Sequence, residues 1–224
     1  MKRLICMILS LAMLLSVASM LSGCNSDAKK IVGTWKAEVD ITEMFTEGFE
    51  KELKKVSQDA ASFFKFKEYT LTFVITFHKD GTYVRNVDTD SLDALITKIT
   101  VDVRKGLERF FTDLFKKQGL IGDVDLLLFQ STGKTFDMLV SELTTALNDS
   151  REEMEAKEEG RYVVQKDMIF FSMDKETDPD GSNYDTFTMY NDTLILQTCS
   201  CQVKPEEKQY NDRLYPMVFK KQAA

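Results

Sequence analysis

The residues best able to do chemistry are few and lie far apart in the chain. Cys199 and Cys201 form a Cys-Ser-Cys, and His78 is the only histidine. Two cysteines spaced i, i+2 on an extended strand lie on one face, with Cα atoms about 6.5–7 Å apart, at or beyond the usual span of a disulfide. We therefore interpret the pair as small, half-buried residues, because no further cluster of Cys or His completes a zinc site.

The acidic stretch DPDGSNYD, residues 178–185, contains oxygen ligands but not the pattern of a calcium loop. An EF-hand needs glycine at position six and glutamate at position twelve, whereas Gly181 stands at position four and no closing glutamate follows. We interpret the stretch as a β-turn and His78 as a surface strand residue. Gly-x-Ser-x-Gly, His-Glu-x-x-His and Walker signatures are absent from the sequence. We therefore expect a protein that is not an enzyme and that uses no metal or cofactor.

The cysteine closest to the leader lies in a different context. Lys2 and Arg3 precede an apolar run over residues 4–15, which is typical of a targeting segment. Leu21-Ser22-Gly23-Cys24 then resembles the lipobox of bacterial lipoproteins. The resemblance implies that residues 1–23 are a cleaved signal peptide and that Cys24 carries diacylglycerol. Two acyl chains, such as palmitate, on this one cysteine would anchor the chain stably at the extracytoplasmic face of the cell membrane.

Two alternatives to a lipid anchor are an uncleaved N-terminal anchor and a plain secretory signal. The polar run over residues 24–30 is predicted to be a tether, and residues 31–224 the folded domain. Without Lys2 and Arg3 the formal net charge changes from −7 to −9. This acidic balance argues against nucleic acid as a partner and against a polybasic grip on anionic lipid.

Strand patterns occur at both ends of the folded domain. The hairpin at 68–86 turns at Lys79-Asp80-Gly81, and two later hairpins repeat one another with polar turns at Lys166-Asp167 and Asn191-Asp192. The expected strand-bearing ranges are 31–40, 68–86, 161–173, 184–200 and 213–221. Seven or eight short strands at this spacing predict an antiparallel meander.

Helical periodicity interrupts the strands twice. Apolar residues at steps of three and four predict a helix over 43–65 and another over 91–118 that stops at Gly119. A short helical turn at 124–129 and a third long helix over 134–157 follow. The predicted fold is mainly β with helical insertions (α+β), at about 43–65 and 91–157, which form a helical subdomain.

The Gly33-Thr34-Trp35 on the first strand, the turn-bearing segment 77–84 and the repeated hairpins resemble small lipocalin-like domains of bacterial lipoproteins. The resemblance implies an antiparallel barrel or strongly curved meander, with Gly33 and Trp35 closing one end. It also implies a basic residue of the last strand packed over the indole. Lys220 is the candidate and Arg213 the alternative.

Two functions are open at this point. A carrier would bind an apolar small molecule in a cavity lined by phenylalanines: Phe73, Phe77, Phe110, Phe111 and Phe170. A structural or interaction lipoprotein would instead have a filled barrel, and its helical subdomain would bind a protein partner in the envelope. A void of ~300 Å³ or more inside the barrel would favour the carrier. A packed interior with an exposed apolar patch on the helices would favour the partner.

Overall fold

The computed structural model describes residues 25–56, 58–200 and 213–223. The chain forms two compact units. We call the first the barrel unit; it comprises Met1–Ala37, Ile75–Arg85 and Glu158–Ala224. The second, the helical unit, comprises Glu38–Val74 and Asn86–Lys157. The boundary between the units falls within the first three strands.

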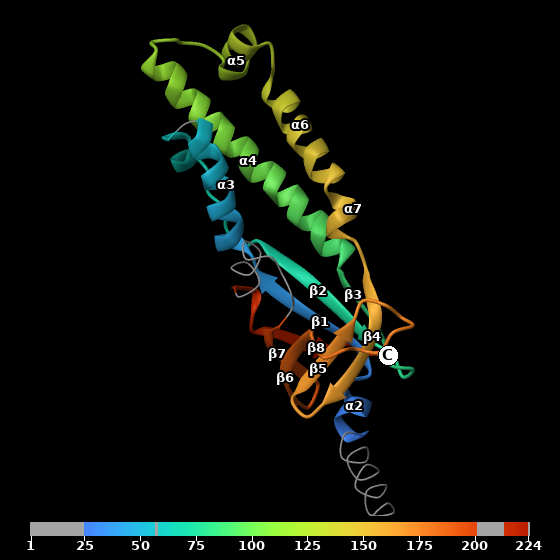
Figure 1. The fold of residues 1–224 in the computed structure, drawn as a ribbon. Helices are drawn as coiled ribbons and strands as arrows, with labels where there is room; N and C mark the ends of the chain where they lie inside the picture. The colour runs from blue at the N-terminus through green and yellow to red at the C-terminus, as the bar shows by residue number, and fades with distance from the viewer. Residues whose placement is uncertain (1–24, 57, 201–212, 224) are drawn as a thin grey trace, which may run out of the picture. The chain divides into compact units, whose positions relative to one another are not determined.

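Eight strands close into an antiparallel barrel in chain order (Figure 1). Their bounds are β1 Gly33–Asp40, β2 Thr70–Phe77, β3 Thr82–Val87, β4 Glu158–Gln165, β5 Met168–Ser172, β6 Tyr184–Tyr190, β7 Thr193–Cys199 and β8 Met217–Lys221. The barrel closes where β8 pairs with β1, with Trp35 opposite Lys221. The expected fold class, an antiparallel barrel with helical insertions, is confirmed.

The hairpin turns form where the sequence predicts them. Lys166 and Asn191 have φ of 55° and 51°, and Gly81 has φ of 84°. These left-handed conformations reverse the chain tightly between β4 and β5, between β6 and β7, and between β2 and β3. Because the strands alternate in direction, these three turns share one end of the barrel with the start of β1. We call it the Trp35 end, and the opposite end the Arg85 end.

The barrel interior is occupied by side chains at alternate strand positions. Phe77 packs edge-on against Tyr162 with ring centroids 4.8 Å apart, and Tyr83 against Phe171 at 4.9 Å. The buried inward residues are Trp35, Ala37, Ile75, Phe77, Tyr83, Tyr162, Val164, Ile169, Phe171, Phe187, Leu194, Leu196, Met217 and Phe219. An eight-stranded barrel is just wide enough for such side chains to fill.

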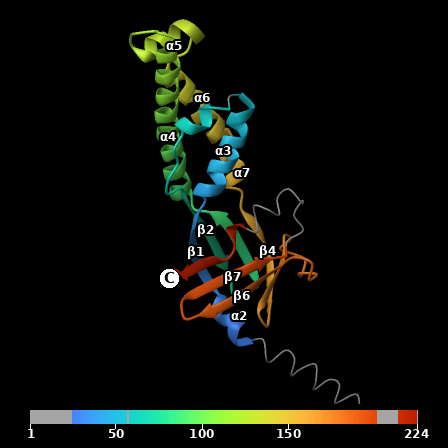
Figure 2. The ribbon, with the colours of Figure 1, turned by 90° about the vertical axis from the view of Figure 1, so that its left-hand side faces the viewer.

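The helical unit is built around one long helix, α4, against which α5 and α6 pack (Figures 1 and 2). Its elements are α3 Thr42–Val56, the 3₁₀ turn η1 Ala60–Phe63, α4 Thr89–Lys117, α5 Val124–Thr132, α6 Phe136–Asp149 and α7 Arg151–Met154. Phe66, Tyr69, Leu95, Ile99 and Val103 form one apolar cluster, and Phe115, Leu128 and Phe136 form another.

Several helix boundaries differ from the sequence prediction. The helix expected over 43–65 ends at Val56, and the one expected over 134–157 is divided into α6 and α7 at Ser150. At this division the Ser150 hydroxyl competes with the backbone, because it also donates to the Ala146 carbonyl, at 3.2 Å. The polar run interpreted as a tether is helical over most of its length. Asn25–Ile31 forms helix α2, whose last residue, Ile31, is buried.

Candidate functional site

Trp35 and Lys221 define the Trp35 end of the barrel. The indole is fully buried, and its Nε1 donates a hydrogen bond of 2.6 Å to the carbonyl of Ile31. The Lys221 Nζ lies 5.1 Å from the centroid of the indole ring and donates to the carbonyl of Lys30 at 2.9 Å. A cation over an aromatic face is attracted by the ring's quadrupole. The first and last strands and α2 are therefore joined around one tryptophan.

Gly33 leaves the room that Lys221 needs. Its φ of 129° is a conformation that side chains rarely adopt, and a Cβ at this position would lie 3.0 Å from Cε of Lys221. A larger residue would push the ammonium away from the Trp35 ring. The placement of Gly33 and Trp35 therefore fits the barrel-closing arrangement that the sequence resemblance implies.

The basic residue over the indole is Lys221, so the expectation of Lys220 is wrong by one position. Lys220 donates to Oγ1 of Thr193, on the outer face of the barrel. Side chains alternate along a strand, and the buried Phe219 sets the inward parity on β8. Lys221 shares that parity and Lys220 does not. The alternative, Arg213, is exposed and lies before β8.

A groove lies beside α2 at the Trp35 end of the barrel unit, lined in part by the inward-facing Tyr162 and Val164. Its volume is about 750 Å³, and its lining residues are Ala28, Lys29, Val32, Lys79, Gly81, Tyr162, Val163 and Val164. It combines aliphatic side chains with two lysines that come from separate elements, α2 and the β2–β3 turn. We call it the α2 groove.

Charged side chains gather at the Arg85 end of the barrel. The Nη2 of Arg85 donates to Oδ2 of Asp185 at 3.0 Å, and its Nη1 lies 3.9 Å from Oε2 of Glu158. Tyr83 donates to Glu158 at 2.5 Å, and Tyr215 to Asp185 at 3.4 Å. The two carboxylates therefore share one guanidinium and are each completed by a phenol.

Burial changes the proton affinity of this cluster. The Asp185 side chain is 1% exposed, and desolvation raises its pKa above the ordinary value although the Arg85 charge opposes this. Burial also raises the pKa of Tyr83 and of Tyr215, so both phenols stay protonated and donate hydrogen bonds. The Arg85 guanidinium lies over the Phe171 ring, 4.7 Å from its centroid, and its buried Nε has no hydrogen-bond partner among the described residues.

The sequence analysis did not predict this cluster, although the alternation of inward and outward residues along the strands indicates it. Arg85 has the inward parity of Tyr83 on β3, and Asp185 has that of Phe187 on β6. A charged residue at a position of inward parity is a candidate for a buried ion pair. Asp185 is the last residue of the stretch interpreted as a turn. The turn itself forms around Asp180, which accepts from the Ser182 backbone N–H at 2.8 Å.

The five phenylalanines proposed to line a ligand cavity do not gather at one site. Phe77 is buried inside the barrel, whereas Phe170 points outward and packs against Tyr184. Phe110 and Phe111 belong to the helical unit, where they contact Phe63 and Phe136. Phe73 also falls in the helical unit and is half-buried. The set is therefore divided between the two units, and Phe170 lies on the outer face of the barrel.

Cys199 is disulfide-bonded, so the expectation of an unbonded half-buried residue is wrong. That expectation assumed an extended strand through Cys201, but β7 ends at Cys199. Cys201, Cys24 and the leader lie outside the described residues. His78 is exposed at the β2–β3 turn.

The helical unit exposes apolar side chains where α4 is followed by α5. Gly119, with φ of 73°, ends α4 as the sequence predicts, and the Leu120 N–H bonds back to the Phe115 carbonyl at 3.0 Å. Ile121 is then 98% exposed, and Leu126, Phe129 and Leu120 are 55%, 48% and 45% exposed. We call these four residues the apolar tip. A Leu-Ile pair between two glycines was the signal available in the sequence.

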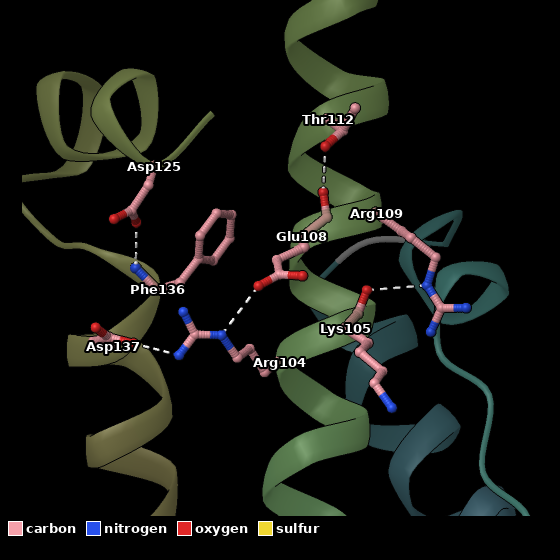
Figure 3. A network of polar contacts seen from close by, with 8 residues as sticks. All are labelled: Arg104, Lys105, Glu108, Arg109, Thr112, Asp125, Phe136 and Asp137. Atoms are coloured by element: carbon pink, nitrogen blue, oxygen red, sulfur yellow. Dashed lines mark hydrogen bonds and ion pairs between the residues drawn. The ribbon is translucent and has the colours of Figure 1, made fainter. Parts of the chain in front are cut away.

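Polar contacts hold the elements that carry the apolar tip (Figure 3). The Arg104 guanidinium of α4 bonds Glu108 at 3.0 Å and also reaches Asp137 of α6. The Asp125 carboxylate of α5 accepts the Phe136 N–H at 2.7 Å, at the start of α6. These contacts therefore link α4, α5 and α6, the helices that carry or adjoin the tip.

No helix in the described part of the chain is both long and apolar enough to span a membrane. Within residues 25–56, 58–200 and 213–223, no three or more His, Cys, Asp or Glu side chains lie together as a metal site. Comparisons with models of protein families, with curated proteins and with solved structures found no match for this chain.

Proposed function

We propose that this protein is a lipoprotein anchored through Cys24 at the extracytoplasmic face of the membrane, with a non-catalytic, lipocalin-like barrel as scaffold. In this proposal the helical unit binds a protein partner of the cell envelope through the apolar tip. The observation that carries the proposal is the exposure of the tip, above all the 98% exposure of Ile121.

The large side chains that the described residues bury inside the barrel support a scaffold in preference to a carrier. Large rings, among them Trp35, Phe77 and Tyr83, occupy the space where an eight-stranded barrel would hold a small ligand. The charged cluster at the Arg85 end also makes that end unsuitable for an apolar molecule, because its carboxylates would lose their remaining solvent. An interaction surface on the outside of the molecule fits these features better.

The tip has the character of a protein-binding surface. Contiguous exposed aliphatic and aromatic residues are uncommon on monomers and mark interaction sites, in which aromatic anchors contribute much of the affinity. Ile121 and Leu120 come from a loop, and Leu126 and Phe129 come from α5. A partner with an apolar groove would bury exposed apolar side chains from both segments.

The charge of the helical unit favours a protein over a lipid surface as the occupant of the tip. Of its residues, 22 are Asp or Glu and 14 are Lys or Arg, a net charge of −8. Such a unit is repelled by anionic headgroups. We therefore expect a partner whose groove has a basic rim, since complementary charge raises the rate of association.

Site-specific photocrosslinking in the native host tests the tip. A photoreactive residue at position 121 is expected to give a discrete adduct, and one at the exposed Thr145 of α6 is the matched control. The pair of substitutions Leu126→Ser and Phe129→Ser should remove the adduct at position 121. Equal adducts at 121 and 145, or an adduct that survives both substitutions, would contradict the proposal.

Metabolic labelling with a fatty-acid probe tests the anchor. The wild-type chain is expected to take up label and to sediment with membranes, and the Cys24→Ala chain to do neither. A Cys24→Ala protein that remains labelled and membrane-bound would exclude the anchor, whatever the tip does.

A further inference from the structure

We infer that the α2 groove binds the headgroup of an anionic phospholipid in the membrane that holds the anchor, and so places the Trp35 end of the barrel against the lipid surface. This inference rests on the proposed lipidation of Cys24 but not on the proposed partner of the apolar tip. It concerns the barrel unit alone.

The short distance along the chain between the anchor and the groove is the first support. Cys24 is followed at once by α2, and Ala28 and Lys29 of that helix already line the groove. One peptide bond and four helical residues place the Cα of Lys29 about 10 Å or less from that of Cys24. Because the headgroup layer is about 5–7 Å deep on each side of the bilayer, the groove cannot lie far from it.

Because α2 is helical and held to the barrel, the distance between the anchor and the groove is restricted. The buried Ile31 ends the helix, and its carbonyl accepts the indole N–H of Trp35 at 2.6 Å. The carbonyl of the preceding Lys30 accepts from the Lys221 ammonium at 2.9 Å. A flexible tether would let the barrel turn freely above the membrane, whereas a helix held to the barrel core restricts it.

The chemistry of the groove matches a phospholipid headgroup. Lys29 and Lys79 are exposed, and neither ammonium forms an ion pair with a described residue. The acidic neighbour Asp80 is directed to its own turn, where it accepts from the Thr82 N–H at 3.0 Å and from the Thr82 hydroxyl at 2.7 Å. Two lysines that line one groove thus offer their ammonium groups to an anionic headgroup.

The aliphatic wall of the groove suits the part of a lipid below its phosphate. Val32 and Val163 line the groove next to the two lysines, and Val163 is an exposed valine on the outer face of β4. An amphipathic site that pairs lysine ammonium groups with aliphatic side chains is typical of surfaces at the membrane interface. The overall charge of the chain does not oppose this, since its acidic excess lies in the helical unit.

Quenching of Trp35 fluorescence tests the inference, because Trp35 is the only tryptophan and lies at the same end of the barrel. Lipidated protein purified in detergent is reconstituted into vesicles of phosphatidylcholine alone or with phosphatidylglycerol. Both contain phosphatidylcholine with a nitroxide on its headgroup. We expect stronger quenching in the vesicles that contain phosphatidylglycerol.

The double variant Lys29→Gln, Lys79→Gln should abolish the difference between the two vesicle types. The matched control, Lys51→Gln with Lys54→Gln on α3 of the helical unit, should retain it. Unchanged emission of each variant without quencher verifies that the barrel is intact. Equal quenching in both vesicle types, or a difference that survives the loss of Lys29 and Lys79, would overturn the inference.

Flotation of the same samples separates this result from a failure of the anchor. Protein that floats with the vesicles but shows no dependence on phosphatidylglycerol removes only the groove inference. Protein that does not float with either vesicle type removes the proposed anchor and this inference with it.

Discussion

The barrel unit and the helical unit differ in net charge and in the burial of their ion pairs. From Cys24 onward the barrel unit has 14 acidic and 13 basic residues, and one of its ion pairs joins the buried Asp185 to Arg85. The helical unit has a net charge of −8 and exposed pairs such as Lys54 with Glu50. Exposed pairs contribute little to stability, whereas breaking a buried pair is costly. We therefore expect the barrel to be sensitive to substitution and the helical surface to be tolerant.

The largest expected effect is the loss of Trp35. Trp35→Ala should lower the free energy of unfolding by about 3–5 kcal/mol, because the indole is fully buried and its N–H bonds the Ile31 carbonyl. Urea titration followed by circular dichroism measures this. Trp35→Phe, which retains a ring, should lose less. A loss below about 1 kcal/mol for Trp35→Ala would mean that the barrel end is not held by this residue.

Substitution of one glycine in each unit compares how much stability each unit loses when a methyl group is added. A Cβ on Gly160 of β4 would lie 1.7 Å from the Ser172 backbone carbonyl oxygen, whereas one on Gly106 of α4 would lie 2.2 Å from a ring carbon of Phe64. A ring can rotate and a paired strand cannot. Gly160→Ala should therefore cost about 3 kcal/mol or more and Gly106→Ala about 1–2 kcal/mol. Thermal unfolding of both variants checks the order, and the reverse order would contradict the comparison.

The buried ion pair should give the barrel a pH dependence of its own. Asp185→Asn leaves Arg85 with only the more distant Glu158, and we expect a loss of about 3 kcal/mol or less at neutral pH. Burial raises the folded-state pKa of Asp185 above 3.8. Its proton therefore stabilises the fold at low pH, and this contribution is lost as the pH rises through the raised pKa.

The variant lacks this titrating group, so the stability difference between wild type and Asp185→Asn should grow as the pH falls from 7 to about 4. Urea titrations of both proteins over this range measure the difference. Titrating groups that both proteins contain contribute equally to the two stabilities and cancel in the difference. A difference that shrinks on acidification would mean that attraction to Arg85 outweighs desolvation and that the pKa of Asp185 is lowered.

The smallest expected effect on stability is at the apolar tip. Ile121→Ser should change the free energy of unfolding by less than about 0.5 kcal/mol, because the side chain is 98% exposed. The same substitution should abolish co-purification of the partner that crosslinking at position 121 identifies. Destabilisation as large as that of Gly106→Ala would show that Ile121 packs within the unit, and the tip would lose its role as a free surface.

Much of the fold could be predicted because its signals are local. Polar turns at Lys166 and Asn191 define two hairpins, and Gly119 stops α4. The periodicity of apolar residues distinguishes helix from strand over most of the chain. Helix ends were less predictable where they depend on packing. The helix expected to reach Phe64 stops at Val56, and Phe64 instead packs between Phe49 and Phe66 in the core of the helical unit.

The candidate sites were less predictable than the fold because they combine residues from distant parts of the chain. Arg85 and Asp185 are a hundred residues apart in sequence and meet only because the strands close into a barrel. The α2 groove likewise joins the first helix to the β2–β3 turn and to β4. Composition gave the sign of the total charge but not its concentration in one unit.

The sequence by itself determined the number and kind of most elements, the turns between strands and the position of Trp35 at the start of the barrel. These depend on backbone preferences and on residues within a few positions of one another. Only the tertiary structure decided that Lys221, not Lys220, lies over the indole, that Arg85 pairs with Asp185, and that Ile121 is left uncovered. The reason is physical: strand pairing fixes which side of each strand faces inward, and a shift of one residue exchanges buried and exposed side chains.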